Sequence, residues 1–488
     1  MCSPTTRVSM TLSPDYDFDV IIVGARCAGA SLASELAQAG RRVLVLDRAE
    51  FPSDAFSTHL IQADGVEFLR RHGVLERVAE AGAPLLSQVR VIFDGVEINE
   101  HYRSTDPSPG AMSISRKVLD AALCDHAVAS GATLLTRAEF RDVCIENGRL
   151  VGIGVLTAEG HRVIRAPLVV GADGRLSQLG SSVNARSYNS APGERFIYWA
   201  DFVGSTPSPQ MLSIRTGDFQ WAAYPSDAGV LTVAVVPPMR VYEQFMTDPV
   251  ASFDQLVESE EPLRSLIGDG IRTNRPRGTI ALDSFFREAA GPGWCLVGDA
   301  GVFKDPVLGQ GIGDAFRQSS ALAGFLDGVD LSRSQAVDHA LLQFWRWRDR
   351  DLTDMYWLAV DAAEQRSLNR LETAMFSTLK DNRELAHTLA VEIPAHWSSS
   401  GKVFNMRTVL RALPEARRLP RRHQQTLVRI LCERVALQLR RDLSAATRRR
   451  KLRPLTVSDP VGLELLAVEV PLEVAKSEIQ APAHGEPQ

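Results

Sequence analysis

Two short segments of the sequence carry glycines and carboxylates in the pattern that binds a dinucleotide. The first reads Gly24-Ala25-Arg26-Cys27-Ala28-Gly29 after an apolar run, and Asp47 ends the next apolar run, eighteen residues beyond Gly29. Gly24 permits a tight turn, Gly29 permits close packing of the following helix, and the helix N-terminus attracts a pyrophosphate. Asp47 stands where a carboxylate can accept hydrogen bonds from a ribose.

One position of this fingerprint departs from the usual pattern. Arg26 occupies the place of a second glycine, which normally lets the backbone approach the pyrophosphate. Either the chain stands slightly away from the phosphates, or the guanidinium supplies charge that replaces the lost contact. When this segment is considered alone, its glycines could also serve only the packing of the helix against the strand.

The second segment runs from Gly298-Asp299 to Gly311 and follows another apolar run. A carboxylate at a strand end, such as Asp299, can bond a polyol hydroxyl. Gly309 and Gly311 allow backbone N–H groups at a helix N-terminus to reach an acceptor. On a flavin that acceptor is the pyrimidine edge, where donors stabilise negative charge on the reduced ring.

Hydrophobic periodicity predicts the elements that position these residues. Continuous apolar runs predict strands buried on both faces, and these runs lie at 20–23, 43–46, 168–171 and 294–297. Alternation over 196–236 predicts an antiparallel sheet, and 89–98 reads as a hairpin. Helical spacing covers 66–78 and 115–129, and the chain beyond 327 is mainly helical in pattern.

Composition restricts the class of protein. A length of 488 residues predicts more than one domain, and 45% hydrophobic with 23% charged residues is typical of a soluble globular protein. A net charge of −5 argues against general nucleic-acid binding. No apolar run reaches the ~18 residues of a membrane span. The six cysteines lack metal-ligand spacing, so we expect reduced thiols, no metal and a cytoplasmic location.

A strongly basic stretch extends over 407–453 and includes Arg417-Arg418 and Arg448-Arg449-Arg450-Lys451. A solvated helical face is the favoured interpretation. Because the rest of the chain is acidic, a docking surface for an acidic partner such as a carrier protein is the alternative.

Together with Ala172-Asp173-Gly174, the two segments resemble FAD-dependent oxidoreductases, a family that includes class A flavoprotein monooxygenases, geranylgeranyl reductases and flavin-dependent halogenases. The resemblance covers roughly 17–326. It implies FAD bound with its adenosine half at Gly24, Gly29 and Asp47, its ribityl chain at Asp299 and its ring at Gly311-Ile312. The cofactor-binding residues predicted in this way are Gly24, Ala25, Arg26, Gly29, Ala30, Asp47, Arg48, Arg116, Asp173, Asp299, Gly309, Gly311 and Ile312.

The resemblance also implies an α/β fold, with a Rossmann-like FAD-binding domain of the glutathione-reductase type interrupted by an antiparallel-sheet substrate domain. A helical C-terminal region follows. The expected boundaries are 1–16 for an N-terminal tail, 17–85, 111–180 and 286–327 for the FAD-binding domain, 86–110 and 181–285 for the substrate sheet, 328–478 for the helical region, and 479–488 for a C-terminal tail.

Departures from the family pattern shape the functional prediction. The family often reads Asp-Gly-x-x-Ser-x-x-Arg, whereas here Ser177 is present and Gly180 takes the arginine position, which counts against NADPH or NADH as electron donor. Halogenases usually carry a Trp-x-Trp-x-Ile-Pro segment and a lysine that captures hypohalous acid, but the nearest stretch here keeps only Trp221. His59 reads either as a general base or as a structural histidine, so the catalytic base stays unassigned.

The favoured prediction is a monooxygenase that acts on an organic, natural-product-like and hydrophobic substrate through a flavin hydroperoxide. An alternative is a non-redox [4+2] cyclase of polyketide biosynthesis that uses FAD structurally. A halogenase or a geranylgeranyl-reductase-like enzyme is less favoured, and a flavin-binding interaction protein without catalysis is a further alternative.

Overall fold

The computed structural model describes residues 16–418, apart from positions 56, 58, 206, 207, 281 and 365. Nearly all of the predicted tail at 1–16, the whole tail at 479–488 and most of the basic stretch 407–453 lie outside the described residues. Those predictions therefore stay predictions.

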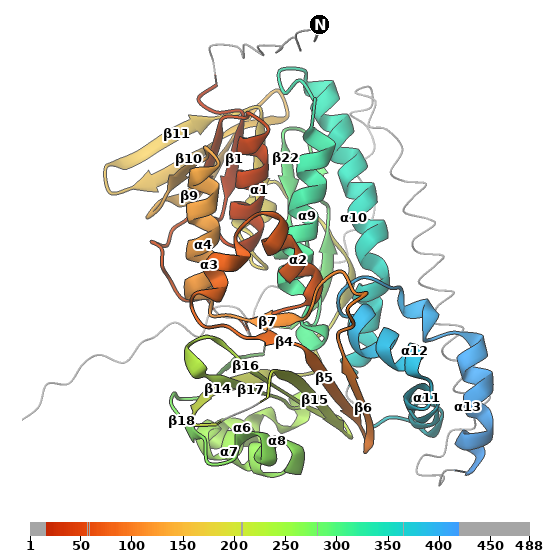
Figure 1. The fold of residues 1–488 in the computed structure, drawn as a ribbon. Helices are drawn as coiled ribbons and strands as arrows, with labels where there is room; N and C mark the ends of the chain where they lie inside the picture. The colour runs from red at the N-terminus through yellow and green to blue at the C-terminus, as the bar shows by residue number, and fades with distance from the viewer. Residues whose placement is uncertain are drawn as a thin grey trace, which may run out of the picture. The chain divides into compact units, whose positions relative to one another are not determined.

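A six-stranded sheet underlies the nucleotide-binding half (Figure 1). Its neighbours run parallel, except for the edge pair β21 and β22. The sheet order is β21 (Ala290–Gly291), β22 (Trp294–Leu296), β12 (Leu168–Gly171), β1 (Val20–Val23), β2 (Val43–Leu46) and β8 (Thr133–Leu135). The four apolar runs therefore form central strands, as their composition predicts.

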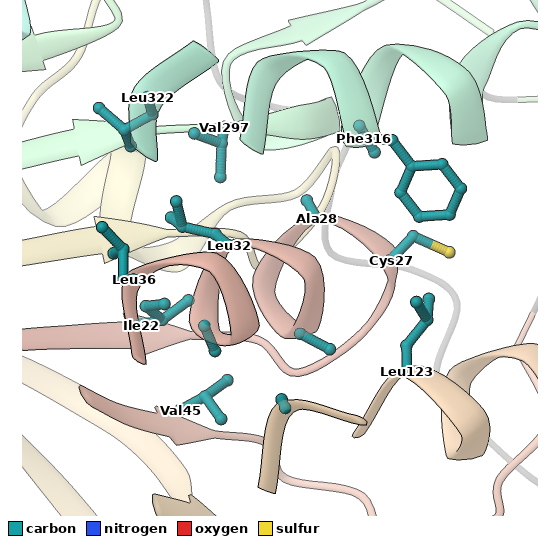
Figure 2. Packing of buried hydrophobic residues seen from close by; sticks show 14 of the residues in the cluster. Ile22, Cys27, Ala28, Leu32, Leu36, Val45, Leu123, Val297, Phe316 and Leu322 are labelled. Atoms are coloured by element: carbon teal, nitrogen blue, oxygen red, sulfur yellow. The ribbon is translucent and has the colours of Figure 1, made fainter. Parts of the chain in front are cut away.

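Alternate side chains of this sheet enter two different cores, because successive residues of a strand point to opposite faces. Val20 and Ile22 pack with α1 (Cys27–Gln38), α4 (Arg116–Ala129) and α9 (Gly311–Leu326). Figure 2 shows Leu32 and Leu36 of α1 beside Val297 and Leu322.

Ile21 and Val23 point to the other face of the sheet. There they pack with an antiparallel three-stranded sheet. Its strands are β9 (Glu139–Glu146), β10 (Arg149–Thr157) and β11 (Gly160–Arg165). With helices on one face and this sheet on the other, the parallel strands are buried on both sides.

The second large sheet belongs to the segments predicted as the substrate domain. In the described part its order is β18 (Ile271–Arg272), β14 (Ile197–Val203), β17 (Leu231–Val236), β16 (Phe219–Pro225), β15 (Gln210–Thr216), β5 (Gln88–Phe93) and β6 (Val96–His101), with β19 (Arg277–Thr279) beside β14. The predicted hairpin is confirmed by the pairing of β5 with β6. Neighbouring strands are antiparallel except β5 and β15, which are parallel and come from separate chain segments.

The two faces of this sheet pack against different helices. Phe202, Trp221 and Val233 lie on the face covered by α6 (Tyr242–Thr247), α7 (Pro249–Glu258) and α8 (Glu261–Ile267). Met211 and Tyr224 lie on the opposite face, in an apolar cluster with residues of the C-terminal helices. The helices that contribute to this cluster are α10 (Ser334–Ala362), α11 (Arg370–Lys380) and α12 (Arg383–His387), and α13 (Met406–Arg418) packs against α11.

Two small sheets connect the larger ones. They comprise β3 (Leu60–Ile61), β7 (Ala111–Ser113) and β4 (Leu85–Leu86), and β13 (Ser187–Ala191), β20 (Ser284–Arg287) and β23 (Val302–Phe303). The single helix predicted over 66–78 is wrong in detail, since α2 (Ala63–Arg71) and α3 (Leu75–Ala79) are separate. Gly73, with φ of 67°, adopts a left-handed conformation that ends the first of them. Within the described residues, the helices are either too short or too polar to cross a bilayer.

Candidate functional site

The predicted cofactor residues gather at the carboxyl ends of the parallel strands. Gly24 follows β1, Asp47 follows β2, Asp173 follows β12 and Asp299 follows β22. Because these strands are parallel neighbours, their carboxyl ends meet at one edge of the sheet, where ligands of open α/β sheets bind.

The first turn has no room for side chains at its two outer glycines. Gly24 has φ of 100°, and a Cβ added there would lie 2.4 Å from the carbonyl oxygen of Ala172. A Cβ added at Gly29 would lie 1.7 Å from the carbonyl oxygen of Gly24. Ala25 and Ala30 are fully buried. The turn therefore brings the N-terminus of α1 directly against the strand ends.

Asp47 ties the turn to the second strand. Its Oδ2 accepts the backbone N–H of Ala25 at 3.0 Å, and its Oδ1 accepts that of Ala49 at 2.8 Å. A carboxylate has further acceptor positions, so Asp47 keeps capacity for ribose hydroxyls. Arg48 is exposed.

The anomalous Arg26 is held by a buried carboxylate. Its Nη1 donates to Asp120 Oδ2 at 2.6 Å, and its Nη2 donates to Ser53 Oγ at 3.1 Å. Arg116 donates to the same carboxylate at 3.0 and 2.8 Å. Two guanidinium groups thus share Asp120, which is completely buried, and the cluster keeps a net positive charge beside the turn.

The sequence prediction did not single out Asp120. One signal could have identified it, because Asp120 follows Arg116 by four residues, and this spacing places both on one helix face.

Asp173 is engaged within its own loop. Its Oδ1 accepts the Ser177 hydroxyl at 2.6 Å, and its Oδ2 accepts the N–H of Leu179 at 3.1 Å, at the start of α5 (Gln178–Ser182). Ser177 is the N-cap of this short helix, Asp173 supports it, and the contact of Asp173 with a cofactor stays a prediction.

Asp299 differs from Asp47 and Asp173, since no hydrogen bond within the described part of the chain holds its carboxylate. It lies in a 3₁₀ turn, Gly298–Ala300. Burial and the nearby Asp314 carboxylate raise the pKa of Asp299 to about 6, although Arg116, Arg175 and Lys304 act in the opposite direction. Asp299 is only half-buried by its exposed surface, and a carboxylate without donors in such a place is an acceptor available to a ligand hydroxyl.

The first turn of α9 lies next to an open space. A Cβ added at Gly311 meets no atom within 4 Å and Gly311 is exposed, and the N–H groups of a first helical turn have no partner within the helix. Gly309 adopts φ of 65°, and a Cβ there would lie 2.6 Å from Leu60 Cδ2. The loop before α9 thus contacts the apolar cluster that contains Leu60, Met211 and Tyr224.

A buried ionic cluster supports the same loop. Lys304 Nζ lies 2.6 Å from Gln310 Oε1 and 2.9 Å from Asp314 Oδ2, and His396 Nε2 lies 2.8 Å from Asp314 Oδ1. Burial alone would raise the pKa of Asp314, but Lys304 and His396 outweigh burial and lower it. The sequence prediction missed this cluster, because no short spacing links His396 to Lys304.

Gln310 connects the same loop to the C-terminal region. Its Nε2 donates to the carbonyl oxygens of Ile393 and Pro394, at 3.1 and 3.0 Å. The backbone at the start of α9 is therefore fixed by residues more than eighty positions later in the chain.

His59 lies in a strained and buried position. Its φ is 67°, it is 6% exposed, and its Nδ1 has no hydrogen-bond partner among the described residues. Burial lowers the pKa of His59, and the nearby Arg116 lowers it further. The ring is therefore neutral at physiological pH and close to the cationic cluster, and the catalytic base stays unassigned.

These features fit FAD. The tight turn and Arg26 suit a pyrophosphate, Asp47 suits a ribose, the unbonded Asp299 suits the ribityl chain, and the open N-terminus of α9 suits the pyrimidine edge. Among the described residues, no group of three or more His, Cys, Asp or Glu side chains is placed to hold a metal ion.

Replacing Asp299 by asparagine is expected to weaken FAD binding by about tenfold, because an amide oxygen accepts a weaker hydrogen bond than a carboxylate. The FAD-free protein should gain stability at neutral pH. The pKa of Asp299 in the folded protein, about 6, exceeds its ordinary value of 3.8. The Asp299 side chain of the wild type therefore makes its full contribution to stability below pH 3.8, and this contribution is lost as the pH rises through about 6. The gain should be absent near pH 4 and reach at most about 3 kcal/mol above pH 7.

Thermal unfolding of both FAD-free proteins across this pH range measures the gain, and titration with FAD measures the affinity. Asp269→Asn, at an exposed position, is the matched control and should change neither. Unchanged FAD affinity in the Asp299 variant, or a stability difference independent of pH, would contradict the assignment.

Comparison with known proteins identifies the family. The family described as FAD binding domain matches residues 17–330. A 1H-pyrrole-2-carbonyl-[peptidyl-carrier protein] chlorinase of Pseudomonas fluorescens is 24% identical over 345 residues, covering 64% of this chain and 76% of that protein. Rifampicin monooxygenase of Streptomyces venezuelae is 28% identical over 333 residues, covering 64% of this chain and 65% of that protein.

Among solved structures, the flavin-dependent brominase Bmp2 has a TM-score of 0.69 at 18% identity, covering 82% of this chain and 99% of that one. At this identity the likeness concerns the fold alone. The family match, in contrast, extends over well more than half of the chain. This protein is therefore an enzyme of the FAD binding domain family, with FAD as its cofactor.

Proposed function

We propose that the protein is an FAD-dependent monooxygenase that inserts one oxygen atom into a hydrophobic, natural-product-like substrate. The observation that carries this proposal is the contact between Gly309 and Leu60. It joins the loop at the predicted flavin ring to an apolar cluster whose members include Met211, Tyr224 and Met355. A hydrophobic substrate held against that cluster would lie next to the ring.

When bound, FAD supplies the activation of O₂, and the residues of this chain position the substrate and exclude water. Tyr224 and Met211 come from the sheet, whereas Met355 and Val391 come from the C-terminal region. Both regions would therefore determine which substrate fits. Passage through a flavin hydroperoxide stays a prediction, as does a cytoplasmic location.

Halogenation is the second candidate, because one of the relatives is a chlorinase. Trp221 gives it little support. Its Nε1 donates to the carbonyl oxygen of Leu256 at 3.0 Å, and its ring packs on the face of the sheet opposite Tyr224. The comparisons give no support to the cyclase alternative.

A carrier protein is the proposed partner. The chlorinase relative acts on a carrier-bound substrate, and α13 exposes Arg407, Arg411, Arg417 and Arg418 together with the apolar Met406 and Leu410. A basic and apolar helix face complements an acidic protein surface. A substrate tethered to such a carrier would reach the site more effectively than the same substrate free in solution.

The decisive experiment reduces the flavin without oxygen and then adds oxygen with a substrate. NADPH and NADH are tested in turn while the flavin absorbance is followed, and dithionite serves as the reductant control. Pyrrole-2-carbonyl loaded on a peptidyl carrier protein, free pyrrole-2-carboxylate and rifampicin are the probes, each with and without chloride or bromide. Mass spectrometry then distinguishes added oxygen from halogen in place of hydrogen.

We expect addition of one oxygen atom, independent of halide, and greater turnover of the carrier-bound probe than of its free acid at low salt. A product that contains halogen would replace the proposal with halogenation. If dithionite reduces the flavin and neither product forms from any probe when oxygen is added, the oxygenase proposal fails for this substrate class.

A further inference from the structure

The space beside Gly180, which takes the arginine position of the family pattern described above, is occupied by Arg287. Gly180 lies in α5, and a Cβ added there would lie 3.3 Å from both Cδ and Nη1 of Arg287 and 3.1 Å from Ser177 Oγ. Arg287 comes from β20, more than one hundred residues later in the chain. A guanidinium is therefore present at this place, although position 180 does not provide it.

Arg287 hydrogen-bonds to the turn that contains Asp299 and interacts electrostatically with Asp173. Its Nη1 donates to the carbonyl oxygen of Ala300 at 2.8 Å, and Ala300 directly follows Asp299 in the 3₁₀ turn. The positive charge of Arg287 also interacts with Asp173. The side chain thus links the loop after β12 to the turn after β22.

Surrounding contacts fix Arg287 itself. Its guanidinium stacks on the Phe285 ring, 4.6 Å from the ring centre, and its backbone N–H donates to the carbonyl oxygen of Gly301 at 2.7 Å. Its own carbonyl oxygen accepts Nη2 of the buried Arg348 at 2.9 Å. Such a restrained guanidinium loses little conformational freedom in holding the Ala300 carbonyl.

We propose that Arg287 is a positioning residue of the FAD site. From β20 it fixes the loop that contains Asp173 relative to the turn that contains Asp299, and it takes the place of an arginine at position 180. It acts through Ala300 and orients Asp299 toward the ribityl chain. This role concerns binding of FAD and is independent of which reaction the flavin performs.

An arginine transfer tests the proposal. The variants are Arg287→Ala, Arg287→Lys, Gly180→Arg and the double variant Arg287→Ala with Gly180→Arg. FAD affinity is measured by fluorescence titration of the FAD-free proteins, and their thermal unfolding is measured in parallel. Arg186→Ala is the matched control, because Arg186 pairs with Glu288 at the surface and contacts neither motif.

Arg287→Ala is expected to weaken FAD binding by about tenfold or more, since it removes a charge-assisted hydrogen bond. Arg287→Lys should lose less, because it keeps the charge. Gly180→Arg alone should also weaken binding, because two guanidinium groups then compete for one space. The double variant should bind FAD more tightly than either single variant, and this rescue is not expected of a merely structural arginine.

Two results would overturn the proposal. One is FAD affinity in Arg287→Ala equal to that of the wild type or of the Arg186 control. The other is a double variant that binds FAD no better than Arg287→Ala. If Arg287→Ala does not fold, recovery of a soluble, FAD-binding protein in the double variant decides for the proposal, and failure to recover it decides against.

Discussion

Gly29→Ala is expected to abolish FAD binding and to lower the free energy of unfolding by more than about 3 kcal/mol. The added Cβ would lie 1.7 Å from the carbonyl oxygen of Gly24 and 3.2 Å from the Cβ of Ala172. Because these neighbours belong to the first turn and the adjacent strand end, α1 would have to move away from the sheet. The pyrophosphate would then lose the helix N-terminus. Denaturant unfolding and FAD titration measure the two effects.

The chain offers the same substitution at a position without neighbours. Gly324 lies near the end of α9, and a Cβ there meets nothing within 4 Å. Gly324→Ala should therefore raise stability by about 0.5 to 1 kcal/mol, as alanine does in an open helix, and leave FAD affinity unchanged. If the two variants behaved alike, the close packing of α1 on the strand ends would be wrong.

Asp120→Ala is expected to destabilise the FAD-free protein by about 3 to 5 kcal/mol, because it leaves two partly buried guanidinium groups without their shared carboxylate. FAD should restore more stability to this variant than to the wild type, because its diphosphate offers the freed Arg26 an anionic partner. Unfolding measured with and without saturating FAD gives both quantities.

Removing one of the two cations provides the internal control. Arg26→Gly combined with Asp120→Ala restores the usual glycine of the fingerprint and leaves only Arg116 unpaired. We expect the double variant to be more stable than Asp120→Ala alone. A loss below about 1 kcal/mol in Asp120→Ala would mean that solvent, and not this carboxylate, compensates the two charges.

The parts of the fold that depend on short-range patterns could be predicted from the sequence. The four buried strands, the hairpin at 89–98, the helix at 115–129 and the order of the motifs all follow from periodicity and from glycines at fixed offsets. Gly24 and Gly29 act through atoms of their own turn and the next strand. Local spacing is therefore sufficient to recognise them.

The parts that depend on partners far apart in the chain could not be predicted. Arg26 and Asp120 are 94 positions apart, and Gln310 and Ile393 are 83 apart. Nothing in the local sequence of Arg26 indicates that its guanidinium pairs with a protein carboxylate. From the sequence alone, Gly180 indicates that a functional arginine is missing, because the sequence does not reveal that Arg287 fills the adjacent space.

The completely buried Arg348 of α10 connects the C-terminal helices to the backbone around the turn that contains Asp299. It donates to the carbonyl oxygens of Arg287 and Gly301, on either side of the Asp299 turn. The family match ends at residue 330, before this arginine. A module cut at that boundary would remove one donor from each of these carbonyl oxygens and leave the apolar face at Met211 and Tyr224 uncovered. The turn that contains Asp299 therefore depends on a helix that lies beyond the residues matched by the family.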